Sequence, residues 1–203
     1  MPLTSLGSFL AILIFFSSII ASSILYNGSY SPFHNLISDL GSSSKNQIGY
    51  IYFNIGCILT GITIIISAFG LVRWKTINRK QNNLILLSQC CEVLMALALI
   101  MVGIVSEDHG AIHRFWATVF FILLLIFIIV TNIALKNHIN YMREIRYYTL
   151  ISVIIYLIFM FTFSIGVRLP ILEWLAVFSG LIWLGLLGYN TLKLEKSQTS
   201  VLC

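Results

Sequence analysis

The chain has 203 residues, of which 59% are hydrophobic and only 9% are charged, and its formal net charge is +5. Soluble domains usually carry about 25% charged residues, so this composition excludes an ordinary soluble domain. The positive charge alone would suit a nucleic-acid-binding protein. The basic residues are, however, confined to the gaps between apolar stretches, and we expect no nucleic-acid partner.

Six apolar stretches are each long enough to cross a bilayer, which takes about 20 mostly apolar residues in a helix. Because lipid offers no hydrogen-bond partners, the backbone groups of each stretch must satisfy one another, and helices are the expected structure. The sequence therefore predicts an all-α, polytopic membrane protein, a six-helix transmembrane bundle forming a single domain over residues 1–203. The predicted spans are residues 3–26, 47–72, 84–105, 115–135, 149–167 and 171–192.

Most basic residues fall on one side of the predicted membrane. Cytoplasmic connections carry an excess of lysine and arginine, so we expect a multi-pass protein of the cell membrane with its N- and C-termini in the cytoplasm. Basic side chains at the membrane surface also favour contact with anionic lipid. The cytoplasmic set is Arg73, Lys75, Arg79, Lys80, Lys136, Arg143, Arg146, Lys193 and Lys196, and the outer set is Lys45, Arg114 and Arg168.

The connection before the second span predicts a short helix lying at the outer interface. A serine and a proline at its start and a glycine at its end are typical helix boundaries. Over residues 32–40 the apolar side chains share one helical face, and His34, Ser38 and Asp39 lie on the other side. This polar set is a candidate ligand or proton site. Alternatively, the segment is a capped connector whose polar residues are solvated.

The connection before the fourth span contains two histidines four residues apart. In a helix, His109 and His113 would project from one face, as paired metal ligands do in the H-E-x-x-H motif, although Gly110 stands where that motif has glutamate. Glu107 and Asp108 could add oxygen ligands or a general base, which makes a divalent metal such as zinc a candidate cofactor. Alternatively, the two acids only stabilise the N-terminus of the fourth span.

Two further carboxyl groups lie within predicted spans. Glu173 is in the first turn of the sixth span, where the helix dipole favours it, and its expected role is an ion pair with Arg168 or Arg114. Glu92 is near the middle of the membrane in the third span, where an unpartnered carboxyl is costly. We expect it to face the bundle interior, either as a proton-relay or ligand-binding group or as a neutral acid hydrogen-bonded to neighbouring side chains.

Three motifs resemble those of a known membrane family. They are the Asn-Leu-Ile-Ser-Asp-Leu-Gly run at residues 35–41, the Gly-Ile-Val-Ser-Glu-Asp-His-Gly-Ala-Ile-His run at residues 103–113 with Ala117 and Phe120-Phe121 after it, and Glu173 opening the last span. That family is a prokaryotic, largely archaeal, six-span group of unknown function, grouped with the DRAM and Sfk-like membrane proteins. The resemblance covers essentially the whole chain. It implies six helices with the signature residues at one end, and no reaction, cofactor or substrate.

The outer residues are also similar in composition to the alkaline-ceramidase and adiponectin-receptor-like hydrolases. Those are membrane zinc amidohydrolases with a serine, an aspartate and three histidines near one membrane face. Ser38, Asp39, His34, His109 and His113 would supply that set here. The chain departs from the pattern because it has six spans rather than seven, its histidine pair lies mid-chain, and its serine and aspartate are adjacent. The similarity is one of chemistry.

The outer segments are short and are tied to helix ends, so we expect their polar residues to converge over the bundle. The leading hypothesis is an extracytoplasmic histidine/carboxylate site that binds a small ligand, an ion or a lipid headgroup. One alternative is a non-catalytic accessory or scaffold subunit, with other membrane subunits as partners. Another is a membrane metallohydrolase acting on lipid. Membrane lipid is an expected partner in every case.

Overall fold

Six long helices and three short 3-10 helices make up the computed structural model, which describes the backbone of residues 1–201 and the side chains of residues 1–196. The long helices are α1 (Leu3–Ile24), α2 (Tyr50–Gly70), α3 (Arg79–Ile104), α4 (Ala111–Leu135), α5 (Arg143–Ser164) and α6 (Pro170–Val201). The short ones are η1 (Ser38–Gly41), η2 (Leu71–Trp74) and η3 (Glu107–His109). All six long helices are apolar and long enough to cross a membrane, which confirms the predicted fold class.

The helix ends differ from the predicted spans in both directions. Helices α3, α4 and α5 begin several residues before the predicted spans do, whereas α1, α2 and α5 end two or three residues before them. At the start of α3, the Asn78 side chain accepts hydrogen bonds from the backbone N–H groups of Lys80 and Gln81, which is a normal helix cap. Helix α5 ends at Ser164, shortly before Gly166, whose φ of 78° does not continue a helix.

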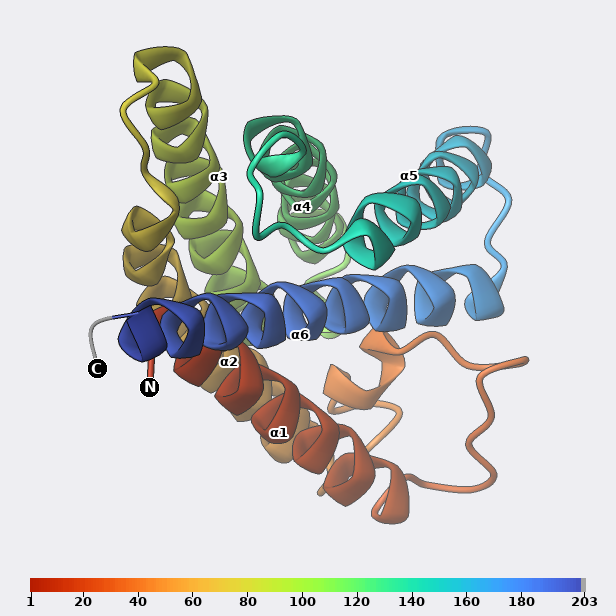
Figure 1. Ribbon diagram of the computed structural model, residues 1–203. Coiled ribbons are helices and arrows are strands. Elements are labelled where there is room, and N and C mark those ends of the chain that lie inside the picture. The colour runs from red at the N-terminus through yellow and green to blue at the C-terminus, as the bar shows by residue number, and fades with distance from the viewer. Residues whose placement is uncertain (202–203) are drawn as a thin grey trace.

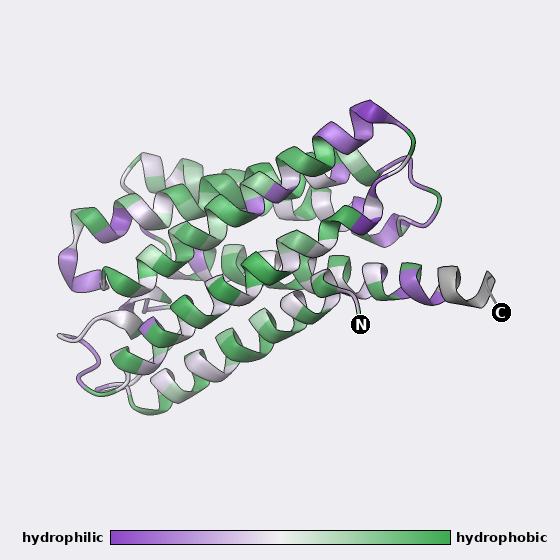
Figure 2. Cartoon of the chain, turned by 90° about the vertical axis from the view of Figure 1, so that its left-hand side faces the viewer, coloured by the Kyte–Doolittle hydropathy of each residue, from purple (hydrophilic) through white to green (hydrophobic). Residues whose placement is uncertain are grey.

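The helices form a ring in chain order. Each long helix packs against the next, and α6 returns to pack against α1 (Figure 1). Apolar residues cover the middle of the helices and polar residues gather at the two ends, and the start of α1 lies at the same end as the C-terminal part of α6 (Figure 2). The connections α1–α2, α3–α4 and α5–α6 therefore all lie at the opposite end, which the sequence predicts to be extracytoplasmic and which is called the outer end below.

Helices α1 and α2 approach most closely at glycines. A Cβ on Gly7 would lie 2.5 Å from both the Ser67 nitrogen and the Thr63 oxygen of α2, and only glycine allows this approach. The Thr4 hydroxyl donates to the Ser67 carbonyl at 3.0 Å across the same interface. Small residues at the contact and interhelical hydrogen bonds are the usual means of holding membrane helices together.

Helix α5 is the least buried of the six, and side-chain hydrogen bonds hold it to α6. Tyr156 donates to the Ala176 carbonyl at 2.7 Å, and Trp183 donates to the Thr149 hydroxyl at 2.9 Å. The side of α5 that faces α4 is packed less closely. This leaves room for a cavity between the two helices, described below.

The helix predicted over residues 32–40 is reduced to a turn followed by the four-residue η1. Two backbone N–H groups that would bond to backbone carbonyls in a regular helix instead donate to side-chain carboxylates. The Leu36 N–H donates to Asp39 at 3.0 Å, and the Ile37 N–H donates to Glu173 at 3.1 Å. Such side-chain bonds compete with helix formation. As a result, Ile37 is buried against the bundle, whereas His34 is exposed and does not share a polar face with Asp39.

Candidate functional site

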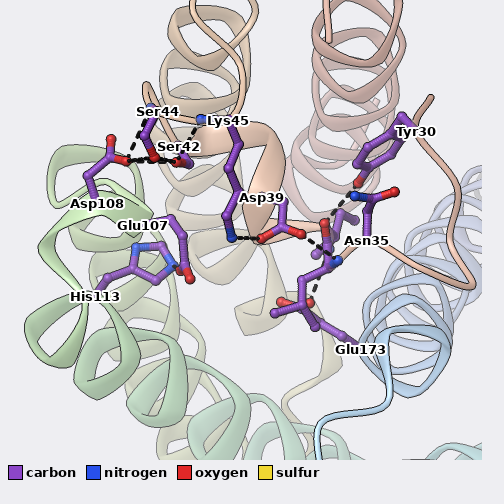
Figure 3. A network of polar contacts seen from close by, with 12 residues as sticks. Tyr30, Asn35, Asp39, Ser42, Ser44, Lys45, Glu107, Asp108, His113 and Glu173 are labelled. Atoms are coloured by element: carbon purple, nitrogen blue, oxygen red, sulfur yellow. Dashed lines mark hydrogen bonds and ion pairs between the residues drawn. The ribbon is translucent and has the colours of Figure 1, made fainter. Parts of the chain in front are cut away.

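The polar residues of the outer end come from three segments that meet over the bundle. They are the connection between α1 and α2, the η3 connection together with the first turn of α4, and the first turn of α6 (Figure 3). The predicted convergence is thus observed for Ser38, Asp39, Glu107, Asp108, His113 and Glu173, which take different roles as described below.

Asp108 holds the η3 connection against the α1–α2 connection through hydrogen bonds. Its carboxylate accepts hydrogen bonds from the Ser42 hydroxyl at 2.7 Å, from the Ser43 N–H and hydroxyl at 2.7 and 2.8 Å, and from the Ser44 hydroxyl at 3.0 Å. Partial burial alone would raise the pKa of Asp108, but these donors hold that pKa well below its ordinary value. Asp108 is therefore a structural carboxylate. Its serine partners were not predicted, since they lie more than 60 residues away in the sequence.

Asp39 is held by an ion pair within its own loop. The Lys45 ammonium lies 2.5 Å from Asp39 Oδ1, while Asp39 Oδ2 accepts the Leu36 N–H. Burial would lower the pKa of Lys45, but the hydrogen bond and charge of Asp39, followed by the charge of Glu107, raise it. Lys45 thus stays charged and lies in the electrostatic field of both carboxylates.

His113 and Glu107 form a pair whose tautomer is set by the backbone. His113 Nδ1 lies 2.6 Å from the Val105 carbonyl oxygen, which can only accept, so Nδ1 carries a proton. The other nitrogen, Nε2, lies 3.3 Å from Glu107 Oε2, and the His113 side chain is almost fully buried. This contact is within ion-pair distance, but among the described residues the buried Nε2 has no hydrogen-bond partner of normal geometry. Nε2 is therefore a polar atom left available to a ligand in the adjoining cavity.

His109 does not join His113. It ends η3, is exposed, and lies 3.3 Å from the Ser106 carbonyl and hydroxyl. Gly110 follows with a φ of 55°, so His109 and His113 are not on one continuous helix, and the predicted metal pair is not assembled. Among the residues that the structure describes, no group of three or more histidine, cysteine, aspartate or glutamate side chains is placed to hold a metal ion.

Glu173 anchors the first loop to α6 and does not form the expected ion pair. Its Oε2 accepts the Ile37 N–H at 3.1 Å, and next to it the Trp174 indole donates to the Asn35 carbonyl at 3.1 Å. Within the described side chains, neither Arg114 nor Arg168 lies within ion-pair distance of a carboxylate. Glu173 is buried and lies close enough to Glu107 and Asp39 for their charges to interact.

Two cavities meet at these residues. The outer one, of about 170 Å³, lies between α4, α5 and the start of α6, and its polar lining consists mainly of Ser38, Glu107, His113, Arg114, Arg168 and Glu173. The inner one, of about 70 Å³, extends into the centre of the bundle and is almost wholly apolar, reaching Phe127 and Trp183. Five residues line both cavities: Ser38, His113, Ala117, Phe121 and Glu173.

Glu92 is fully buried, as predicted, but it lines neither cavity. Ser67 lies near the carboxyl, yet neither carboxyl oxygen has a hydrogen-bond partner of normal geometry. The hydrogen bonds to neighbouring side chains, which one of the two alternatives expected for Glu92, are not formed. An ionised carboxyl without a partner in an apolar interior raises the free energy of the folded state strongly, whereas a neutral carboxyl raises it much less.

The fold and the outer residues define a six-span helical membrane protein with a polar, partly buried site at one end of the bundle. The chain belongs to the family described as "Protein of unknown function (DUF998)", whose model matches residues 9–190. The match includes all three segments that build the site. No curated protein and no solved structure matches the chain. The function is therefore argued below from the site itself.

Replacing Asp108 by alanine should loosen the Ser42–Ser44 segment, because its hydroxyls lose their shared acceptor. We expect hydrogen–deuterium exchange of residues 42–46 to become about tenfold faster, equivalent to about 1.4 kcal/mol of local opening. Glu144→Ala, at an exposed carboxylate on α5, is the matched control and should leave this exchange unchanged. Equal protection in Asp108→Ala and the native protein would contradict the assigned role.

The hydrogen bonds from Ser42, Ser43 and Ser44 to the Asp108 carboxylate should depend on pH. Because folding lowers the pKa of Asp108, their contribution to stability is fully present above the ordinary aspartate pKa of about 3.9. It decreases as the pH falls below that value toward the folded-state pKa. After correction for the intrinsic pH dependence of amide exchange, acidification should lower the protection of residues 42–46 in the native protein and should lower it less in Asp108→Ala.

Replacing Glu92 should be tolerated only by a neutral residue. Glu92→Gln keeps the shape of a neutral acid, whereas Glu92→Lys places a charge in the bundle interior, at a cost of about 3 kcal/mol or more. We expect the glutamine variant to purify as a monodisperse protein within a few degrees of the native melting temperature, and the lysine variant to aggregate. Glu144→Gln and Glu144→Lys are matched exposed controls. A Glu92→Lys protein as stable as Glu144→Lys would contradict the burial of Glu92.

Proposed function

We propose that this protein binds a membrane lipid at the outer end of the bundle. The polar part of the lipid would lie at Glu107, His113 and Glu173, and its hydrocarbon part would extend toward the inner cavity. One observation carries the proposal: a cavity with polar groups at one end joins an apolar cavity at the other, and both are lined by the same five residues. An amphiphile is the class of ligand that fills both environments.

The way into the outer cavity supports a ligand that comes from the membrane. Phe159, Met160 and Phe163 of α5 form one wall of this cavity, and Phe121 of α4 forms another. Helix α5 is the least buried helix of the bundle, and Phe163 is 39% exposed. A lipid would enter sideways between α4 and α5, with its chain against these aromatic rings.

The His113–Glu107 pair gives the site its hydrogen-bonding capacity. With its Nδ1 proton on the Val105 carbonyl, the buried Nε2 of His113 has no hydrogen-bond partner among the described residues and can accept from a ligand hydroxyl, as can the Glu107 carboxylate. The Ser38 hydroxyl at the junction of the two cavities can donate to a ligand oxygen. This favours a ligand with hydroxyl or ester oxygens next to its hydrocarbon chain.

Filling the junction between the cavities should expel the lipid. Ala117 lines both cavities, so Ala117→Phe places a ring where they meet. We expect lipid that co-purifies with the protein, measured by mass spectrometry after gel filtration, to fall at least fivefold. Ala111→Phe, at an exposed position on the same helix, is the matched control and should retain the lipid. Equal lipid content in both variants, each monodisperse, would contradict the proposal.

We further propose that the site-bearing end faces away from the cytoplasm in the cell membrane, as the basic residues indicate. In a chain without its native cysteines, Ser29→Cys at the outer end should react with an impermeant thiol reagent added to intact cells. Ile77→Cys, which is fully exposed at the opposite end, should react only after the cells are broken. The reverse pattern would place the site on the cytoplasmic side.

A further inference from the structure

We propose that the lipid bound at this site is a phospholipid whose headgroup carries a net negative charge, and that Arg114 and Arg168 bind its phosphate. This inference rests on the proposed lipid site and adds the charge and orientation of the ligand. It starts from the two guanidinium groups that line the outer cavity.

Arg114 and Arg168 are the cations of the outer end that the protein itself does not neutralise. Arg114 is on the first turn of α4, and Arg168 is in the connection between α5 and α6, so two separate elements bring them to one cavity. Within the described side chains, neither forms an ion pair. Lys45, the third basic residue at this end, is already paired with Asp39.

The carboxylates nearby already have partners. Glu107 faces His113, Glu173 accepts the Ile37 N–H, and Asp108 is surrounded by serine donors. Within the described side chains, Arg114 and Arg168 have no such partner, so a phosphate beside them would meet two unpaired positive charges. Guanidinium groups bind phosphate through two parallel hydrogen bonds, more selectively than a lysine does.

The cavity-lining residues differ in how deeply they are buried, and this difference predicts which part of the ligand lies near the surface and which part lies inside. Arg168 is exposed and Arg114 is half-buried, whereas His113 and Glu173 are buried and the inner cavity beyond them is apolar. From the surface inward, the site therefore presents cations, then hydrogen-bonding groups, then hydrocarbon. A phospholipid has the same order: phosphate, then glycerol and ester oxygens, then an acyl chain.

Free phosphate does not account for this site. The walls of the cavity that the two arginines line include the rings of Phe121, Phe159 and Phe163. The apolar cavity that adjoins it would stay unfilled if the ligand were an inorganic ion. A lipid without a phosphate would leave both guanidinium groups unpaired, and in a zwitterionic lipid the headgroup ammonium already offsets the single phosphate charge, so two unpaired arginines favour a headgroup of net negative charge. The combination of the two features favours an anionic phospholipid.

The test offers the purified full-length protein an equimolar mixture of phosphatidylglycerol and phosphatidylcholine with identical chains, and measures bound lipid by mass spectrometry after gel filtration. We expect the native protein to retain phosphatidylglycerol at least tenfold over phosphatidylcholine. Arg114→Gln/Arg168→Gln should lose this preference while still retaining lipid. Arg114→Lys/Arg168→Lys keeps both positive charges and should retain part of the preference. This result would show that the loss in the glutamine variant comes from the lost charge and not from substitution at these two positions.

Arg79→Gln is the matched control, since Arg79 is exposed and lines neither cavity. It should keep the native preference, and an equal loss there would overturn the inference in favour of general surface charge. Equal binding of the two lipids by the native protein would also overturn it, while lipid loss in Ala117→Phe would still support the lipid site. If inorganic phosphate alone at millimolar concentration displaced the lipid completely, the acyl chain would have no role and the inference would fail. If the native protein retained neither lipid, the proposed function itself would fail.

Discussion

The hydrogen bond from the Ile37 N–H to the buried carboxyl of Glu173 is the contact on which the outer end of the protein depends. It ties the α1–α2 connection to the first turn of α6, two segments that are 136 residues apart in the sequence. Trp174 strengthens the tie by donating to the Asn35 carbonyl. With the loop fixed in this way, Ile37 and Leu40 pack into the end of the bundle and close it.

Asp108 performs the corresponding task on the other side of the same loop. Its contacts with three consecutive serines hold the η3 connection against the loop, and this in turn places Glu107 and His113 beside Lys45 and Asp39. The two anchors explain why acidic residues gather at this end without being available as metal ligands. Asp108 and Asp39 are used to build the site, whereas Glu107 and His113 face the cavity.

A membrane helix that packs loosely on one side is consistent with a site that opens toward lipid. The apolar surface of α5 gains nothing by being buried in protein rather than in lipid tails, because both surroundings are equally apolar. The hydrogen bonds from Tyr156 and Trp183 keep α5 attached to α6. A lipid chain entering between α4 and α5 would not have to break these bonds.

The sequence was sufficient to predict the features that depend on local pattern. Apolar runs of membrane length predicted the six helices. The free-energy cost of exposing a carboxyl to lipid predicted the inward position of Glu92. The collection of polar residues at one end followed from the short connections between spans. Ser38, Glu107, His113 and Glu173 were all predicted as site residues, and all four line the outer cavity.

The features that were missed depend on contacts between distant segments. The helix predicted over residues 32–40 is shortened because Asp39 and Glu173 bind its backbone, and the second of these bonds cannot be read from local spacing. The pairing of His109 with His113 assumed a continuous helix, which the conformation of Gly110 interrupts. Phe121 was noted only as part of a motif shared with the resembling family, and Phe159 only as part of the fifth span. Their place in a cavity wall was missed, since apolar residues facing a cavity and those facing lipid look alike in sequence.

The proposed lipid site requires that an acyl chain lie between α4 and α5 and reach the interior of the bundle. The decisive measurement is photo-crosslinking of the native protein in nanodiscs that contain a phospholipid carrying a diazirine near the end of its acyl chain. The crosslinked residues, mapped by peptide mass spectrometry, should be concentrated at the cavity walls on α4, α5 and α6, and unlabelled lipid of the same headgroup should compete for them. Crosslinks spread evenly over the lipid-facing surfaces of α1, α2 and α3, without competition, would contradict it.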